Sequence, residues 1–383
     1  MKKKLLAALL ASALAAGLLP TSACAAPYYT TANATLVTLT DSFATAKGKY
    51  TGYEIDGTDV SITAAGTYVF SGDCDNGSIT VKKGVTGVTI VLNGLTLTND
   101  DSAAITLNKT AEASLIAAAG TTNTVADTEG SNDENAAVKV KSGAALAIGG
   151  TGTLTVDGNA KNGIKGAADA VITVAEVKLN INAANDGLSC DDELNITGGT
   201  LSITAGGDAV KASPDTGDTG NPDTTSLGNV TISGGTLTLA TGDDGVHADN
   251  DLVIGAKGAS STSTPRINIT ASYEGLEGTT VTVYSGDIDV VASDDGVNAA
   301  NSTLGERSDK YAISIAGGDL YIDAGSDGLD SNNDINITGG KVEVYGADAM
   351  MDAAIDYDGT FTLSGGTLFG AGMEPSGGTQ ALR

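Results

Sequence analysis

Short runs of alternating apolar and polar residues recur along most of the chain, and turn residues separate them. Clear examples are Leu194-Asn195-Ile196-Thr197, Leu201-Ser202-Ile203-Thr204 and Leu237-Thr238-Leu239. Successive side chains of a β-strand point to opposite faces, so each run predicts a short strand with one buried face. The pattern therefore predicts an all-β protein.

Two kinds of turn separate these strands and recur in order. The first turn has an acidic or amide residue, then Gly or Ala, then an aliphatic residue, and its copies are Asn162-Gly163-Ile164, Asp186-Gly187-Leu188, Asp208-Ala209-Val210, Asp244-Gly245-Val246, Glu274-Gly275-Leu276, Asp295-Gly296-Val297, Asp327-Gly328-Leu329 and Asp348-Ala349-Met350. The second turn is a Gly-Gly or Ser-Gly pair, at Gly198-Gly199, Gly234-Gly235, Ser285-Gly286, Gly317-Gly318, Gly339-Gly340 and Gly365-Gly366. We expect the glycines of both turns to supply the positive φ angle that a tight corner needs.

The spacing of the turns indicates how the strands are organised. Unbroken repeats have about 21 to 22 residues, as from Gly275 to Gly296 and from Gly328 to Ala349. Coils of two or three strands that stack on one another are typical of a solenoid. The usual chirality of parallel crossovers favours a right-handed coil. We therefore predict a right-handed parallel β-helix, with loop insertions at residues 214–227, 256–265 and 303–310, where the spacing is longer.

The N-terminus has the pattern of an export signal. Lys2-Lys3-Lys4 precede an apolar run from Leu5 to Leu19, and Ala23-Cys24-Ala25 fits a cleavage site. These features predict a signal peptide over residues 1–25 and a secreted, extracellular protein. Lipid attachment at Cys24 is the alternative that the sequence leaves open.

The mature chain is expected to be a single β-helix domain, over residues 26–383. Residues 26–124 have a looser repeat and are expected to form the cap and early coils, whereas residues 125–383 form the regular coils. No apolar run after the signal is long enough to predict a membrane span.

Composition and charge add two constraints. The chain has 52 glycines, four phenylalanines and no tryptophan, which indicates a core of small side chains. Its formal net charge of −27 argues against electrostatic attraction to nucleic acid or any other polyanion. A polyanionic ligand would therefore need a cation between itself and the protein. Cys74 and Cys190 lie far apart in the sequence and do not predict a disulfide framework.

Stacking the repeats brings the acidic residues into columns. Carboxylates in register on adjacent coils would lie about 5 Å apart, where like charges destabilise the stack. Calcium, which binds six to eight oxygens, is the simplest counter-ion, and the absence of clustered His or Cys argues against zinc or copper. We predict calcium as the cofactor, with candidate ligands Asp186, Asp191, Asp192, Asp208, Asp243, Asp244, Asp249, Asp294, Asp295, Asp327 and Asp330. The alternative is ordinary turn chemistry, in which each Asp side chain bonds to its own backbone.

The ordered recurrence of these turns resembles a family of secreted bacterial carbohydrate-binding β-helices that bind polygalacturonate and cellulose. The segments that carry the resemblance are Val91 to Asn99, Ala103-Ala104-Ile105, Asn162 to Lys165, Asn185 to Leu188 and Asp243 to Val246. The similarity covers about Ile55 to Met373 and implies a fold related to pectate lyases, calcium at the Asp turns, and binding as the main role. Ala209, Ala349 and Glu274 depart from the family pattern, which puts sites at those coils in doubt.

We therefore expect a calcium-dependent carbohydrate-binding protein for acidic plant-type polysaccharide such as polygalacturonate or pectin, with cellulose as a further candidate. Lys211 and the rings of Tyr273, Tyr321 and Tyr345 are the candidate ligand-binding residues, although the tyrosines also fit ordinary outward strand positions. The sequence predicts no nucleic-acid partner and does not give the oligomeric state.

Two other functions stay open at this stage. A polysaccharide lyase would need a basic residue, Lys211 or Lys165, to remove a proton beside a uronate carboxylate that calcium acidifies. His247 lies in the same column as these lysines and is expected to face solvent. A structural or adhesive cell-surface β-helix is the remaining alternative.

Overall fold

The computed structural model describes residues 32–130, 132–214, 227–259, 264–301, 304–305, 308–347 and 353–372. The predicted signal peptide with Cys24, most of the predicted insertion at residues 214–227, parts of the other two insertions and the predicted turn at Asp348-Ala349-Met350 lie outside these residues. The chain divides into two compact units, Met1–Ser202 and Ile203–Arg383, which we call unit 1 and unit 2 and describe separately. A single β-helix domain over residues 26–383 stays a prediction.

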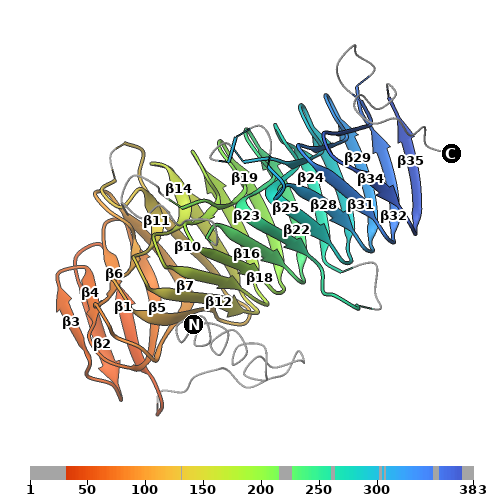
Figure 1. Cartoon of the computed structure of the whole chain (residues 1–383). Helices are drawn as coiled ribbons and strands as arrows, with labels where there is room; N and C mark the ends of the chain where they lie inside the picture. Colours follow the sequence, from red (N-terminus) through yellow and green to blue (C-terminus); the bar gives the residue numbers. More distant parts are fainter. Residues whose placement is uncertain are drawn as a thin grey trace. The chain divides into compact units, whose positions relative to one another are not determined.

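Within the described residues, all regular secondary structure is β-strand, as the alternating pattern predicted (Figure 1). This part of the chain contains no helix that is both long and apolar enough to cross a membrane. Each coil of the chain contributes short strands to three ladders, and within a ladder the strands of successive coils pair in parallel.

In unit 1, antiparallel pairing occurs at the start, where β2 (Ala44–Gly48) pairs with β1 and β3 (Tyr53–Asp56) pairs with β4. Ladder 1 contains β1 (Thr35–Leu39), β5 (Gly66–Cys74), β7 (Val88–Asn99), β9 (Glu112–Ala117), β12 (Ala145–Gly150), β15 (Val171–Val174) and β18 (Glu193–Ile196). Ladder 2 continues from the second half of β7 through β10 (Thr122–Asp127), β13 (Thr153–Gly158) and β16 (Lys178–Ala183). Ladder 3 contains β4 (Asp59–Ile62), β6 (Ser78–Val81), β8 (Ile105–Leu107), β11 (Ala136–Val140), β14 (Asn162–Gly166) and β17 (Leu188–Cys190).

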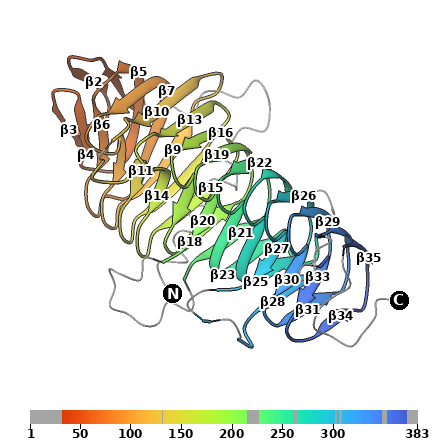
Figure 2. The ribbon, with the colours of Figure 1, turned by 90° about the horizontal axis from the view of Figure 1, so that it is seen from above.

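The same three ladders describe unit 2, and β19 (Thr200–Ala205) contains the boundary between the units. Ladder 1 contains β21 (Asn229–Ile232), the second halves of β23 (Val246–Ile254) and β25 (Leu276–Val283), β28 (Ala312–Ile315), β31 (Asp334–Ile337) and β34 (Phe361–Leu363). Ladder 2 contains β22 (Thr236–Thr241), β24 (Arg266–Ala271), β26 (Asp287–Ala292), β29 (Asp319–Ala324), β32 (Lys341–Tyr345) and β35 (Thr367–Ala371). Ladder 3 contains β20 (Val210–Ala212), the first halves of β23 and β25, β27 (Val297–Ala299), β30 (Leu329–Ser331) and β33 (Ile355–Tyr357), which Figure 2 shows side by side.

The core lies inside the coils and is built by the alternation that the sequence displays. In β29, Leu320 and Ile322 are fully buried, whereas Tyr321 between them is exposed. Parallel pairing places Leu320 beside Val342 and Ile322 beside Val344, so that the buried aliphatic side chains of successive coils stack. Each unit is therefore solenoid-like, with a core that every coil extends.

The two turns use glycine for different reasons. Gly318 and Gly340, in the second turn, have φ angles of +97° and +87°, as expected. The φ angles of Gly296 and Gly328, in the first turn, lie outside the left-handed region, so the expected positive φ is wrong there. A Cβ on Gly328 would lie 2.6 Å from the carbonyl oxygen of Ala354 on the next coil. At Gly296 and Gly328 the first turn therefore uses glycine because neighbouring coils approach closely, not because of its backbone conformation.

The last predicted repeat has a different register from the one that the sequence spacing suggested. A 21-residue repeat aligns Leu329 with Met350, but Leu329 pairs with Ile355. The amide of Gly328 accordingly donates to the carbonyl oxygen of Ala353. The coil is therefore longer than predicted, and Ala353 replaces Asp348 as the residue that stacks beside Asp327.

Candidate functional site

The first set of candidate ligands is the turn column, which we define as the residues that immediately precede the Gly or Ala of the first turn. Its members are Asn162 and Asp186 in unit 1, and Asp208, Asp244, Glu274, Asp295 and Asp327 in unit 2. Backbone hydrogen bonds keep them in register within each unit, because the residue after one member donates its amide to the carbonyl of the next member of that unit. These bonds measure 2.9 Å from Gly245 to Glu274 and 2.9 Å from Gly296 to Asp327.

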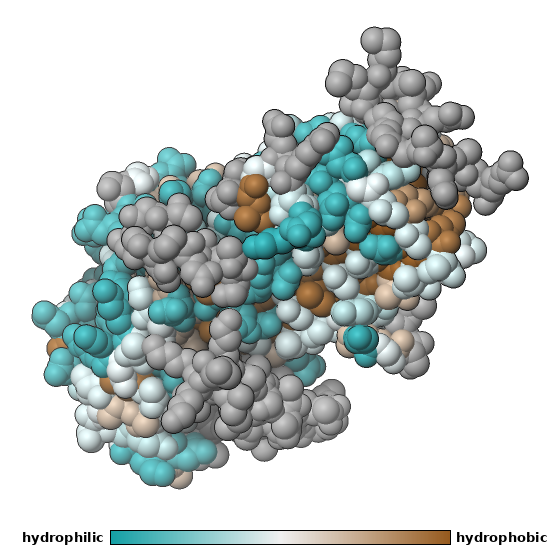
Figure 3. Space-filling view, viewed as in Figure 1, coloured by the Kyte–Doolittle hydropathy of each residue, from teal (hydrophilic) through white to brown (hydrophobic). Residues whose placement is uncertain are grey.

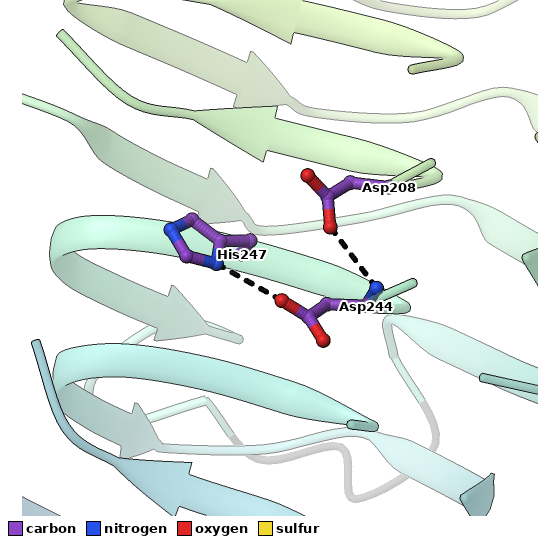
Figure 4. Close-up of side chains that lie close together, drawn as sticks. All are labelled: Asp208, Asp244 and His247. Atoms are coloured by element: carbon purple, nitrogen blue, oxygen red, sulfur yellow. Dashed lines mark hydrogen bonds and ion pairs between the residues drawn. The ribbon is translucent and has the colours of Figure 1, made fainter. Parts of the chain in front are cut away.

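Side chains of the turn column also connect successive coils. The amide of Asp244 donates to Oδ1 of Asp208 at 3.0 Å, as Figure 4 shows. In unit 1 the amide of Asp186 donates to Oδ1 of Asn162 at 3.1 Å. The turn chemistry considered above, in which an Asp bonds to its own backbone, is thus replaced by a bond to the neighbouring coil. One oxygen of these side chains is structural, and an uncharged Asn can provide it.

The second set is the strand column, which we define as the outward residues of ladder 3 three positions after the turn column. In unit 2 these residues pair in the order Lys211, His247, Glu277, Asn298, Asp330 and Asp356. The column begins with two residues that can be cationic and continues with acids and an amide. In this column, the residues that can be cationic therefore lie on the first coils of unit 2.

Lys211 and His247 pair directly with the turn column. The ammonium group of Lys211 forms an ion pair with Asp208, whose side chain is fully buried. Nδ1 of His247 lies 3.0 Å from Oδ2 of Asp244 (Figure 4), and the same nitrogen contacts Oε2 of Glu277. Nε2 of His247 lies 2.9 Å from Oδ1 of Asp249. With a side chain only 17% exposed, His247 does not face solvent as expected.

We call Asp244, His247, Asp249, Glu274 and Glu277 the histidine cluster. Burial disfavours the imidazolium, but hydrogen bonds to Asp244, Asp249 and Glu277 outweigh it and raise the pKa of His247 well above its ordinary value. Burial also disfavours the Asp244 carboxylate, yet the bond to His247 holds its pKa below the usual range. Burial, with the charges of Glu277 and Asp244, raises the pKa of Glu274 to about 9. The cluster thus holds more carboxylates than its one imidazole can neutralise.

We call Asp295, Asn298, Asp327 and Asp330 the oxygen cluster. Burial, followed by the charges of Asp295 and Asp327, raises the pKa of Asp330 to about 8. Asn298 is 8% exposed, and its Oδ1 is buried without a hydrogen-bond donor among the described residues. Ladder 3 places Asn298 beside Asp330. No ion pair between described residues involves Asp330. These oxygens fit the ligand preference of calcium.

In unit 1 the candidate ligands Asp186, Asp191 and Asp192 are all buried. Nζ of Lys165 lies 3.5 Å from Oδ1 of Asp191, so a lysine of this chain supplies part of the counter-charge. Ladder 3 places Lys139 beside Lys165. Burial and the charge of Lys165 lower the pKa of Lys139.

Besides Asp208, which pairs with Lys211, two predicted ligands lie outside both clusters of unit 2. Asp243 is exposed, and Asp294 is half-buried. The coil of Tyr273 separates them, because the amide of Tyr273 donates to Asp243 at 2.7 Å and the amide of Asp294 donates to Tyr273 at 2.9 Å. The structure therefore does not bring Asp243 and Asp294 to one ion.

The candidate sugar-binding tyrosines fall in two places. Tyr321 and Tyr345 lie on the outward face of ladder 2, with ring centroids 5.5 Å apart, and Phe369 extends the row at 5.8 Å. Figure 3 shows apolar surface exposed among hydrophilic residues toward the C-terminal end of unit 2. Tyr273 instead lies at a turn, where a hydrogen bond to Asp294 raises its pKa to about 12. Among the described residues, no ring contact joins Tyr273 to the aromatic row of Tyr321, Tyr345 and Phe369.

Three residues of these sites were missed from the sequence. Glu277 and Asn298 occupy the position of His247 on later coils, so extending that column past the histidine would have found them. Phe369 follows the last predicted turn, at Gly365-Gly366, and aligns with Glu343 through ladder 2, which only the register of β35 reveals.

Comparisons of the sequence with known proteins identify one family. The family profile described as "Carbohydrate-binding domain-containing protein" matches residues 56–306 and, in a second match, residues 265–368. A relative from Acetivibrio thermocellus with the same description is 31% identical over 136 residues, which are 33% of this chain and 47% of the relative. The chain thus spans about half the length of that relative. The solved structure of the polysaccharide lyase-like protein from C. thermocellum aligns with a TM-score of 0.49 and 24% identity over 76% of this chain and 96% of that one.

Proposed function

This chain belongs to the carbohydrate-binding domain family, and we propose that it binds acidic polysaccharide such as polygalacturonate through calcium held by the oxygen cluster. A bound Ca²⁺ would take oxygens from Asp295, Asn298, Asp327 and Asp330 and share its remaining coordination positions with uronate carboxylates. The ion would neutralise both the buried acids and the ligand, which a chain of net charge −27 cannot attract unaided.

The observations that carry the proposal concern two groups of the oxygen cluster, the Asp330 carboxyl and the amide oxygen of Asn298. Asp330 has two turn-column carboxylates as its main charged neighbours, and burial makes its ionised form costly. The amide oxygen of Asn298 beside it lacks a donor among the described residues, and a buried acceptor without a partner costs about 1–3 kcal/mol. A divalent ion that contacts both groups would relieve both costs. A proton on Asp330 would also supply a donor, but it would leave the charges of Asp295 and Asp327 unchanged.

The proposal also includes two predictions from the sequence, the right-handed coil and the secretion of the protein. The right-handed coil rests on the chirality of parallel crossovers. Secretion rests on the N-terminal pattern, with lipid attachment at Cys24 as the alternative. An extracellular location would place the protein where polysaccharides of this kind occur.

A lyase is less well supported than binding, because both candidate bases are engaged. Lys211 pairs with Asp208, and Lys165 lies 3.5 Å from Asp191. Each lysine would have to leave a buried carboxylate of this chain before it could reach a substrate proton. Absorbance of unsaturated product during incubation with polygalacturonate and calcium would reveal a lyase.

Neutral glucan is a second candidate ligand, and the aromatic row favours it. Tyr321 and Phe369 are 41% and 55% exposed, so their rings offer apolar surface to sugar faces. This surface lies on ladder 2, whereas the oxygen cluster lies on ladder 3 and its turns. Binding of neutral glucan is therefore expected to be independent of calcium.

The test is calorimetric titration of oligogalacturonate into the protein, with calcium and with chelator. We expect binding in calcium only, and an affinity reduced at least tenfold in Asp330→Asn. Asp323→Asn is the matched control, because Asp323 is exposed on ladder 2 and loses the same charge. Equal binding in chelator, or an equal loss in the control, would refute the proposal.

A further inference from the structure

The histidine cluster differs from the oxygen cluster because it contains a nitrogen ligand. Nε2 of His247 lies 2.9 Å from Asp249, and Nδ1 faces Asp244 at 3.0 Å and contacts Glu277. Metal-binding histidines commonly donate one ring N–H to a carboxylate and direct the other nitrogen at the ion. Asp249 has the position of that orienting carboxylate.

Hydrogen bonds alone do not satisfy this arrangement. Nδ1 of His247 carries at most one proton but faces oxygens of two carboxylates, Asp244 and Glu277. Oε2 of Glu274 is buried and has no hydrogen-bond partner among the described residues, because the bond from Asn298 reaches Oε1. This oxygen is a second observation, separate from the geometry of the histidine. A bound cation would give it a partner.

The candidate ligand atoms form two overlapping groups that share Asp244. Ligand atoms of Asp244, Glu274 and Glu277 lie within 4.8 Å of one another, as do those of Asp208, Asp244 and His247. Atoms bound to one metal at about 2.0–2.2 Å lie roughly 3–4.4 Å from each other. Small movements of flexible Glu side chains would close the remaining difference.

We propose that the histidine cluster is a separate site for a transition-metal ion of the zinc class, with Nδ1 of His247 and carboxylate oxygens of Asp244, Glu274 and Glu277 as ligands. Imidazole with carboxylates suits Zn²⁺, Co²⁺ or Mn²⁺, whereas calcium prefers oxygen alone. The argument from the sequence against zinc looked for clustered His or Cys. It did not anticipate one histidine surrounded by acids from neighbouring coils.

Binding to this site replaces a proton. The ion forms a bond to Nδ1, and the proton that the imidazolium loses leaves to solvent. Zinc and a proton therefore compete for Nδ1. The partly exposed His247 side chain gives an ion a route into the site.

His247 is the single histidine of the chain, so its imidazole resonances report on this site alone. The experiment records the imidazole resonances of untagged protein by NMR during titration with Zn²⁺ in millimolar calcium. We expect one equivalent of Zn²⁺ to shift the resonances and Co²⁺ to shift them far outside the diamagnetic range. Resonances that do not move with either ion would overturn the proposal, whatever the variants do.

Calorimetry on variants tests the ligands. We expect His247→Gln and Glu277→Gln to weaken zinc binding at least tenfold, and Asp323→Asn to leave it unchanged. Zinc affinity within twofold of wild type in His247→Gln would overturn the assignment. Calcium-dependent oligogalacturonate binding by His247→Gln should stay at the wild-type level. Its loss would overturn the separation of the two sites without refuting calcium-dependent binding.

Discussion

The backbone amide of Asp327 donates a 2.9 Å hydrogen bond to Oδ1 of Asp295 on the preceding coil. The same relationship joins Asp244 to Asp208 and Glu274 to Asp244. A turn-column carboxylate therefore contributes to structure with one oxygen as well as to the charge of the site. Substitutions can separate these two contributions, because an amide side chain preserves the acceptor and removes the charge.

The first prediction concerns Asp295. Asp295→Asn retains Oδ1, and its free energy of unfolding in chelator should lie within about 0.5 kcal/mol of the wild-type value. The reason is that Asn162 accepts the equivalent bond in unit 1. Asp295→Ala leaves the buried amide of Asp327 without its acceptor and should lower the free energy of unfolding by about 1–3 kcal/mol. Chemical denaturation in chelator measures both values.

Calcium titration of the same two proteins completes the comparison. Both variants should bind calcium at least tenfold more weakly than wild type, since both lack a carboxylate ligand. If Asp295→Asn kept the calcium affinity of wild type, Asp295 would be structural only.

The second prediction concerns the first turn. A Cβ on Gly296 would lie 2.1 Å from Cγ2 of Ile322 and 2.7 Å from the carbonyl oxygen of Gly328. Gly296→Ala should therefore destabilise unit 2 by about 1–3 kcal/mol or more, as overpacked cores do. In Gly370→Ala the nearest atom, Cβ of Ala354, is 3.4 Å away, so this control should be nearly neutral. Equal melting temperatures of the two variants would contradict the close approach of the coils.

Sequence reasoning correctly predicted the features whose residues all lie within one coil. The strands, the order of the turns and the turn column from Asp208 to Asp327 all follow from alternation and recurring motifs within single coils. It failed for features that depend on the register between neighbouring coils. The coil that follows Gly328 is longer than the repeat, and no local pattern indicates that Ile355 rather than Met350 pairs with Leu329.

In the candidate site, too, residues within one coil could be predicted, whereas contacts between coils could not. The Asp residues of the turn column could be identified because each lies next to a turn. The imidazole of His247 meets Glu277, which is 30 positions later in the chain, only because ladder 3 pairs them. Burial also depends on the stack, and this is why a histidine expected to face solvent is largely covered.

The third prediction is a pH dependence of the calcium-free protein. The pKa values of Glu274 and Asp330 are raised to about 9 and about 8, from ordinary values of 4.5 and 3.8. The folded protein therefore holds protons that the unfolded chain releases, and the stability they contribute is present at low pH and is lost as pH rises toward 9. The loss should amount to a few kcal/mol, since one pKa unit corresponds to about 1.4 kcal/mol.

Melting curves in chelator between pH 5 and pH 9 measure this effect. Other acids of ordinary pKa do not change charge in this range, so they do not mask it. Added calcium should replace the proton on Asp330 and reduce the dependence on pH. A melting temperature in chelator that stays constant or increases with pH would show that these acids are not crowded in the folded protein.

The fourth prediction concerns the aromatic row. Tyr345→Ala removes the ring that contacts both Tyr321 and Phe369 and should weaken retention on soluble β-glucan about three- to tenfold, with or without calcium. Phe43→Ala is the control, because Phe43 is an exposed aromatic residue that belongs to unit 1 and lies outside the row. Affinity electrophoresis compares the two variants, and unchanged mobility of Tyr345→Ala would exclude the row as a sugar platform.

The central claim is that buried acids of the oxygen cluster hold a divalent ion. The most direct measurement combines metal analysis after dialysis against calcium with the melting temperature before and after chelation. We predict at least one tightly held calcium per chain, and a melting temperature at pH 8 that chelator lowers and added calcium restores. Protein that retains no calcium and melts at the same temperature in chelator would contradict the account.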